Sequence, residues 1–174
     1  MFEWWPALPL FAGAALATLL GERFRAAVML GAPLLGAYGL YQLAPGTTVT
    51  LELFDYVLTP VRVDALSLLF GYLFHLAAFI GVLFALHVRD RLQDVAALAY
   101  AGSAVGAVFA GDLLTLFVYW ELLALTSAVL VFARRSERAQ AAGMRYLLMQ
   151  VGSGVLLLAG ALGYASATGG LGFD

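Results

Sequence analysis

The chain has 174 residues, of which 63% are apolar and only 11% are charged, and its formal net charge is −2. Soluble domains are about 45–50% apolar and about 25% charged. A soluble fold of this length cannot hide so much apolar surface. The composition therefore excludes a disordered chain, a nucleic-acid-binding protein and an ordinary soluble enzyme, and it predicts a membrane protein.

Several residue types that build chemical sites are absent or scarce. The chain has no cysteine, which excludes disulfides and thiolate sites for zinc or iron–sulfur clusters. It has two histidines, too few for a multi-histidine metal site, and no phosphate-binding or nucleophile motif. We therefore expect no cofactor and no metal in this chain. All nine basic residues are arginine, so lysine is absent.

Six segments are long and apolar enough to cross a bilayer, which takes about 20 residues for about 30 Å of hydrocarbon. They are residues 5–21, 26–43, 65–87, 92–110, 113–133 and 138–165. They predict an all-α integral membrane protein with a single membrane domain over residues 1–174. The start of the chain carries Glu3 and lacks the basic residues of a signal peptide, so we expect it to remain as the first span.

Cap and turn residues mark the boundaries of these segments. Asp64 and Ser136 can each cap the helix that follows them. Gly111 is expected to end the fourth helix as a C′ glycine, a position that usually takes left-handed backbone. Asp112 then caps the fifth helix, so the fourth and fifth helices should form a tight hairpin.

Residues 47–63 follow a different pattern, in which polar and apolar residues alternate. The polar set is Thr48, Thr50 and Glu52, and the apolar set is Val49, Leu51 and Leu53. A period of two is typical of a strand. We therefore expect a short extended or hairpin segment at the membrane surface.

The arginines indicate how the chain is oriented in the membrane. Three of the connections share one face, and they contain Arg23, Arg25, Arg89, Arg91, Arg134, Arg135 and Arg138. Arg145 lies close to that face, and only Arg62 lies on the other. Cytoplasmic loops carry an excess of basic residues, so this face should be cytoplasmic. Both termini and the segment 44–63 should then lie outside.

Glu121 is an acid in the middle of the fifth segment. It follows Asp112 by nine residues, which places it about 13 Å into the membrane. Ionisable groups at such depth are costly and usually serve a function, so we interpret Glu121 as an ion or proton carrier. The alternative is a protonated structural glutamate that bonds to a neighbouring helix.

Two other polar residues reach similar depth, His75 in the third segment and Gln150 in the sixth. If these two segments adjoin the fifth, His75, Glu121 and Gln150 form one polar cluster, with His75 as a proton relay. In the alternative, His75 is neutral and bonds to a hydroxyl or carbonyl group, and Gln150 only binds helices together.

Smaller polar groups and glycines add weaker signals. Tyr119, Thr126 and Ser127 can extend a proton path or bond to their own backbones. Gly102 and Gly106 form a GxxxG pattern, which permits close approach of another helix.

Three stretches together resemble one known family. They are DALSLLF (64–70), GDLLTLFVYWELLALTSAVLV (111–131) and GMRYLLMQVGSGVLLLAGALGYASATG (143–169). They are similar to the N-terminal part of the antiporter-like family. This family includes the proton-pumping membrane subunits of respiratory complex I (NADH-quinone oxidoreductase) and the large subunits of Mrp-type cation/proton antiporters. The chain most resembles the D-type large subunit of the Mrp antiporters.

The resemblance implies a role for Glu121 and a missing partner. In this family the glutamate of helix five pairs with a lysine of helix seven, and shifts of that pair drive proton movement. The family fold has about fourteen helices in two inverted repeats, whereas this chain has six predicted helices and no lysine. We therefore expect another chain to supply helix seven and the rest. The fourth to sixth helices should then expose an interface with small and polar residues, to which the GxxxG at 102–106 would belong.

The sequence thus predicts a partial antiporter-like subunit of a multi-subunit complex in the bacterial inner membrane. It would translocate protons, alone or in exchange for Na⁺, with other membrane subunits as partners and no nucleic acid. We do not expect it to be an enzyme, because any redox chemistry would lie in partner subunits. The alternatives are a scaffold subunit of an antiporter, hydrogenase or dehydrogenase complex, and a truncated relic.

Overall fold

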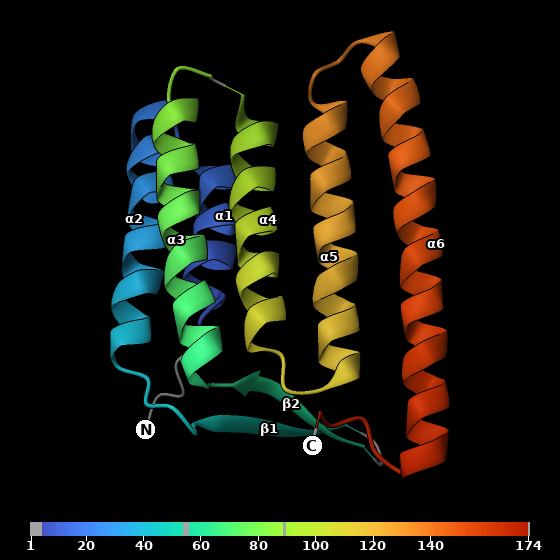
Figure 1. The fold of residues 1–174 in the computed structure, drawn as a ribbon. Helices are drawn as coiled ribbons and strands as arrows, with labels where there is room; N and C mark the ends of the chain where they lie inside the picture. Colours follow the sequence, from blue (N-terminus) through green and yellow to red (C-terminus); the bar gives the residue numbers. More distant parts are fainter. Residues whose placement is uncertain (1–4, 54–55, 89, 174) are drawn as a thin grey trace.

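The computed structural model describes residues 5–53, 56–88 and 90–173 (Figure 1). Its helices and strands are, in chain order, α1 (Leu8–Leu19), α2 (Glu22–Tyr41), β1 (Thr48–Leu53), β2 (Tyr56–Arg62), α3 (Ala65–Ala85), α4 (Arg91–Phe109), α5 (Leu113–Phe132) and α6 (Glu137–Thr168). The fold is therefore mainly helical, as predicted, and each of the six predicted segments overlaps one helix, although α2 begins four residues before the predicted start.

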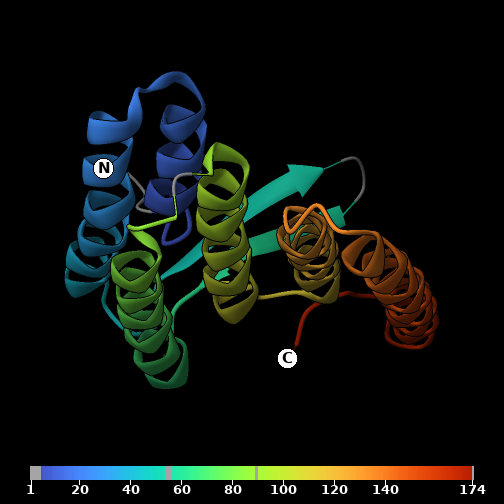
Figure 2. The same ribbon diagram turned by 90° about the horizontal axis from the view of Figure 1, so that it is seen from above.

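The helices stand side by side, and the small sheet crosses one end of the bundle (Figure 1). Helix α4 packs against α1, α3 and α5, while α2 packs against α1 and α3. Helix α6 packs against α5 at the edge of the molecule (Figure 2). The chain therefore consists of a four-helix group, α1–α4, extended by the pair α5–α6.

Four of the described helices, α3 to α6, are long and apolar enough to span a membrane. Helix α1 has 12 residues and is only about 18 Å long at 1.5 Å per residue, so it is shorter than the predicted span 5–21. Pro9 lies in its first turn, the part of a helix that tolerates proline, and the helix begins just before it. Helix α2 has the length of a span, but its first turn contains Glu22, Arg23 and Arg25.

The extended segment predicted at 47–63 is an antiparallel hairpin of β1 and β2. Its pairing slips between Val49 and Leu51, where the register is irregular. Val49 and Val61 are buried against the helices, together with Val63 just after the hairpin. Of the alternating apolar residues, Val49 therefore faces the bundle, whereas Leu51, on the far side of the irregularity, is 47% exposed.

The predicted caps are confirmed. Asp64 accepts a hydrogen bond from the Ser67 backbone, and the Ser67 hydroxyl accepts one from the Asp64 backbone. This reciprocal pair is a capping box. Asp112 and Ser136 accept hydrogen bonds from the backbones of Thr115 and Ala139.

Gly111 directly follows Ala110, the C-cap of α4, so it is the C′ residue as predicted, but it lacks the positive φ that usually favours glycine there. The glycines with positive φ among the described residues are Gly46 and Gly169. Gly111 serves a different purpose, because its N–H donates to the Thr59 carbonyl at 2.9 Å. A Cβ at position 111 would lie 2.5 Å from Thr59 Cγ2. Glycine is needed here because the connection between α4 and α5 touches β2.

The connections α1–α2, α3–α4 and α5–α6 lie at the end of the bundle opposite the sheet (Figure 1). These are the connections in which arginine is concentrated, so we call this the arginine-rich end. The hairpin and the C-terminus lie at the other end (Figure 1). The structure thus confirms that the basic loops gather on one side; that this side is cytoplasmic remains a prediction.

Candidate functional site

Helix α5 places Glu121 near its middle, eight residues after Leu113 and eleven before Phe132. The side chain points to α6, where Gly154 is buried. A Cβ at position 154 would overlap Oε1 of Glu121 and lie 2.7 Å from its carboxyl carbon. Gly154 therefore makes the space that the Glu121 carboxyl group occupies.

The Glu121 carboxyl group is incompletely satisfied within this chain. Its Oε1 atom is buried and has no hydrogen-bond partner among the described residues. A buried carboxyl oxygen without a partner loses its hydration and gains nothing in return. Such a group is an exception among native structures and calls for a partner, a water molecule or a function.

Gln150 lies on the same face of α6, one turn before Gly154, and is half-buried. The structure therefore brings Gln150 to the helix face that Glu121 contacts. His75 is elsewhere. It lies on α3, which packs against α2 and α4, whereas α5 packs against α4 and α6. The predicted condition for a joint cluster, that α3 adjoins α5 and α6, is not met by the helix packing.

His75 is 1% exposed and points to α2. Its Nδ1 lies 2.7 Å from the Gly71 carbonyl oxygen, so Nδ1–H donates this hydrogen bond. A Cβ at Gly36 of α2 would overlap the imidazole ring. Nε2 is buried without a partner among the described residues. The predicted alternative of a His75 bonded to a carbonyl group agrees with this geometry.

The hydroxyl groups near Glu121 hold the helices rather than line a path toward it. Thr126 and Ser127 donate to backbone carbonyls of their own helix at 2.6 and 3.0 Å. The Ser127 hydroxyl also pairs with the Tyr146 hydroxyl of α6 at 2.9 Å. The ring of Tyr119 lies over Gly106 of α4. Helix α5 is thus fixed to α4 by Tyr119 and to α6 by the Ser127–Tyr146 pair.

The GxxxG pattern of α4 is used inside the chain, which corrects the prediction that it belongs to an exposed interface. A Cβ at Gly102 would lie 3.3 Å from Leu10 and Phe11 of α1. Gly106 receives Tyr119 of α5. Both glycines are buried. They allow α4 to contact two helices of its own chain closely.

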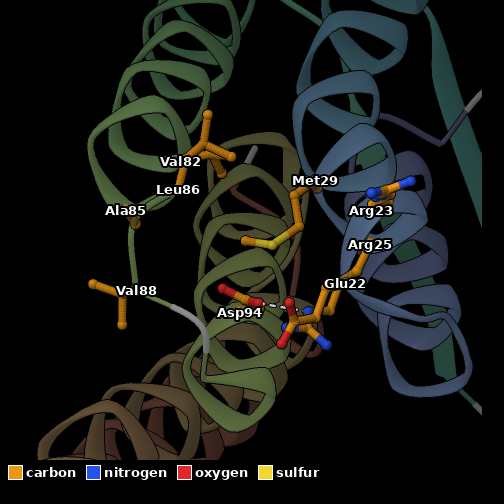
Figure 3. Close-up of a pocket in the computed structure, with 10 residues that line it drawn as sticks. Glu22, Arg23, Arg25, Met29, Val82, Ala85, Leu86, Val88 and Asp94 are labelled. Carbon is orange, nitrogen blue, oxygen red and sulfur yellow. Dashed lines mark hydrogen bonds and ion pairs between the residues drawn. The ribbon is translucent and has the colours of Figure 1, made fainter.

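A buried ion pair that we did not predict joins α2 to α4. Arg25 Nε donates to Asp94 Oδ2 at 2.7 Å, and the two side chains are 6% and 10% exposed. Figure 3 shows Arg25 reaching across to Asp94. The pair lines a pocket of about 190 Å³ at the arginine-rich end. A signal was present in the sequence, because Asp94 is an acid inside the fourth apolar segment.

Residues 110–174 match the family model described as NADH:quinone oxidoreductase/Mrp antiporter, TM. The predicted family resemblance is confirmed. The matched stretch contains Glu121 and the helix pair α5–α6, which forms the candidate site. The more specific resemblance to the D-type large subunit remains a prediction.

The fold is also similar to that of a solved structure. One chain of the membrane-bound sulfane sulfur reductase (MBS), an archaeal respiratory membrane complex, superposes with a TM-score of 0.83 at 23% identity. The alignment covers 97% of this chain but only 28% of that one. At this identity the likeness shows a shared fold. A comparison with curated proteins gave no match.

Asp112 connects the antiporter-like stretch to the hairpin at the end opposite the arginines. It is 1% exposed, and its Oδ2 accepts hydrogen bonds from the Thr59 backbone at 2.6 Å and the Thr115 hydroxyl at 2.7 Å. The backbone of Leu113 also donates to Leu171. The sequence predicted the cap, but not that the same carboxylate holds β2 against the start of the helix that carries Glu121.

Proposed function

We propose that this chain is part of a proton-translocating, antiporter-like membrane subunit in which Glu121 carries the proton. The observation that carries the proposal is the buried Oε1 of Glu121 in the middle of α5, which has no hydrogen-bond partner in the part of the chain that the structure describes. The antiporter-like family match over residues 110–174 supports it. We further propose that the chain functions in a multi-subunit complex, with other membrane subunits as partners.

The physical basis is the cost of a charge in an apolar medium. A lone carboxylate between membrane helices is strongly destabilised, so it takes up a proton and becomes neutral. A cation brought close to it stabilises the charged form again and releases the proton. A carboxyl group that alternates between these two environments moves one proton in each cycle.

The chain has no lysine, and we propose that the cation that pairs with Glu121 lies outside these 174 residues. Among the described arginines, Arg25 pairs with Asp94 and Arg135 pairs with Asp90. The family resemblance points to a lysine of helix seven, a helix that is not among these 174 residues. Exchange of protons for Na⁺ is the corresponding proposal for an Mrp-type complex.

Gln150 and His75 have different places in this proposal. Gln150 lies on the helix face that Glu121 contacts, so it is a candidate polar partner for the carboxyl group. His75 lies on the other side of α4, so a relay through His75 would need a separate path that does not pass directly to Glu121.

The test is Glu121→Gln, which preserves the shape of the side chain and removes its titration. We expect proton transport by vesicles containing the assembled complex to fall at least about tenfold, a typical cost of losing a positioned proton-transfer group. Assembly, measured by co-purification, should persist. Glu137→Gln is the matched control, because Glu137 is an exposed acid in the first turn of α6.

The same variant distinguishes the proton-carrier role from the scaffold alternative. A scaffold subunit would transport protons normally with Gln at position 121. Full activity of Glu121→Gln, with correct assembly, would therefore refute the carrier role and favour a structural subunit.

A further inference from the structure

Five glycines lie along α6, and α5 fills the space beside two of them. At the other three, an added Cβ would meet no atom within 4 Å: Gly152, Gly160 and Gly163. A Cβ at Gly143 would lie 2.6 Å from the ring of Phe132, and one at Gly154 would overlap Oε1 of Glu121. Of the two glycines that receive a side chain of α5, Gly154 is therefore the one that receives an ionisable group.

The two oxygens of the Glu121 carboxyl group have different surroundings. Oε1 is buried in the space that Gly154 leaves, which we call the Gly154 notch, whereas Oε2 is accessible. A Cβ at position 154 would lie 3.4 Å from Oε2, which is an ordinary contact. About one turn away on α5, Val118 and Leu125 are 50% and 52% exposed. The carboxyl group thus lies at the edge of the α5–α6 contact, with Oε1 inside it and Oε2 outside.

Packing rather than hydrogen bonding sets the position of this carboxyl group. Among the described residues, none donates a hydrogen bond to either oxygen of Glu121. A glutamate side chain has several rotatable bonds, and without a donor only its contacts restrict them. Alanine is a better helix former than glycine, so α6 by itself would favour alanine at position 154. What glycine provides there is the room for Oε1.

The difference between the two oxygens bears on proton transfer. Two helices enclose Oε1, so a proton donor or a cation that approaches Glu121 reaches Oε2 first. Proton transfer requires the donor and acceptor atoms to come within hydrogen-bond distance. A residue that fixes which oxygen is accessible therefore fixes where this transfer takes place.

We infer that Gly154 is a positioning residue for Glu121. It seats Oε1 between α5 and α6, and it thereby makes Oε2 the oxygen at which the carboxyl group takes up and releases its proton. This inference rests on the proposed function, in which Glu121 is the proton carrier.

The first test measures the contact itself by thermal unfolding of the full chain in detergent, in its complex where one is purified. Gly154→Ala should lower the unfolding midpoint by at least about 2 °C, because its Cβ overlaps the carboxyl group. Gly152→Ala is the matched control, since a Cβ there meets no atom within 4 Å. In a Glu121→Ala background, which removes the carboxyl group, the loss from Gly154→Ala should disappear. Equal losses in both backgrounds would overturn the inference.

The second test follows the accessibility of the carboxyl group. An apolar carbodiimide reacts with protonated carboxyl groups in apolar surroundings, and peptide mass spectrometry measures the modified fraction of Glu121. Gly154→Ala forces Oε1 out of the notch, so the rate at Glu121 should rise at least about twofold, since two oxygens become accessible instead of one. The unmodified chain and Gly152→Ala should react at the same rate.

Proton transport by vesicles containing the assembled complex then links position to function. Gly154→Ala should lower transport at least about tenfold while assembly persists, because a reacting group displaced by about 1 Å can lose about a hundredfold in rate. Gly152→Ala should transport normally. If Glu121→Gln stops transport but Gly154→Ala reacts and transports like Gly152→Ala, the carrier role stands and the positioning role of Gly154 is refuted. If Glu121→Gln transports normally, the proposed function fails, and the role of Gly154 in transport fails with it.

Discussion

The group α1–α4 and the pair α5–α6 each contain an internal acid, and the two acids are satisfied in opposite ways. In the group, α4 is surrounded by three helices, and 44% of its most apolar stretch is buried. Its internal acid Asp94 has a partner in Arg25. In the pair, only 11% of the corresponding stretch of α6 is buried, and the internal acid Glu121 has an oxygen without a partner among the described residues.

This difference indicates which helices form a hydrophobic core within this chain and which do not. The group has a core of its own, which includes Leu10, Leu98, Val105 and Phe109. The pair has a contact on one side and exposes large apolar residues such as Met149 and Leu156 on the other. Lipid or further protein must cover that surface. The unpaired acid and the uncovered surface occur in the same pair of helices, which is where the proposed partner would act.

The largest effect on stability should come from breaking the ion pair of the four-helix group. Asp94→Ala leaves Arg25 buried without a counter-charge, which costs about 3 kcal/mol. Thermal unfolding in detergent would measure the loss. The double variant Arg25→Met with Asp94→Leu should recover most of it, because two apolar residues replace both charges. Glu121→Gln should leave stability nearly unchanged, and an equal loss from Asp94→Ala and Glu121→Gln would contradict the comparison.

A smaller loss of stability is expected from a variant at the contact between α5 and the four-helix group. Gly106→Ala places a methyl group in the ring of Tyr119, and overpacking of this kind costs about 1–3 kcal/mol. Gly152→Ala is the matched control, because a Cβ there meets no atom within 4 Å. Since alanine is the better helix former, the control should be neutral or stabilising. If both variants unfold at the same temperature, the Tyr119 contact is looser than described.

The smallest effect on stability should come from Asp64, the cap of α3. The Ser67 backbone N–H that donates to Asp64 holds the pKa of this carboxyl group below its ordinary value of 3.8, and Arg62 adds to the effect. The carboxylate therefore stabilises the fold above that value, and this contribution is lost as the pH falls through the lowered pKa. Because the side chain is half exposed, we expect a change of less than about 1 kcal/mol.

Unfolding measured from about pH 6 down to about pH 3, a range that brackets the ordinary pKa of an aspartate, would detect this change. Asp64→Asn keeps a side chain that can cap the helix but removes its titration. The pH dependence of stability should therefore be smaller in this variant than in the unmodified chain. An identical pH profile would show that the Asp64 cap makes no titrating contribution.

The local features of the fold could be read from the sequence. The hydrophobic segments predicted the six helices, and the alternation from Thr48 to Leu53 predicted the hairpin. Asp64, Asp112 and Ser136 were recognisable caps, because a cap depends only on residues within one turn. Glu121 was recognisable as a candidate because its depth follows from its position in one helix.

Contacts between distant segments could not be read in this way. Gly111 looked like a helix-ending glycine, but the approach of Thr59 from β2 is what requires it. The glycines of the GxxxG pattern looked free for a partner, but Tyr119 and α1 occupy them. His75 was expected to join Glu121, but α4 lies between their helices.

The sequence by itself determined that this is a helical membrane chain with a carboxyl group near the middle of its fifth helix, and that its last third resembles the antiporter-like family. Hydrophobic length and local hydrogen bonding decide these properties within single segments. Only the tertiary structure decided that Asp94 is paired with Arg25, while Glu121 faces Gly154 with an oxygen that no described residue bonds. Which helices become neighbours depends on how complementary side chains and glycines far apart in the chain pack together.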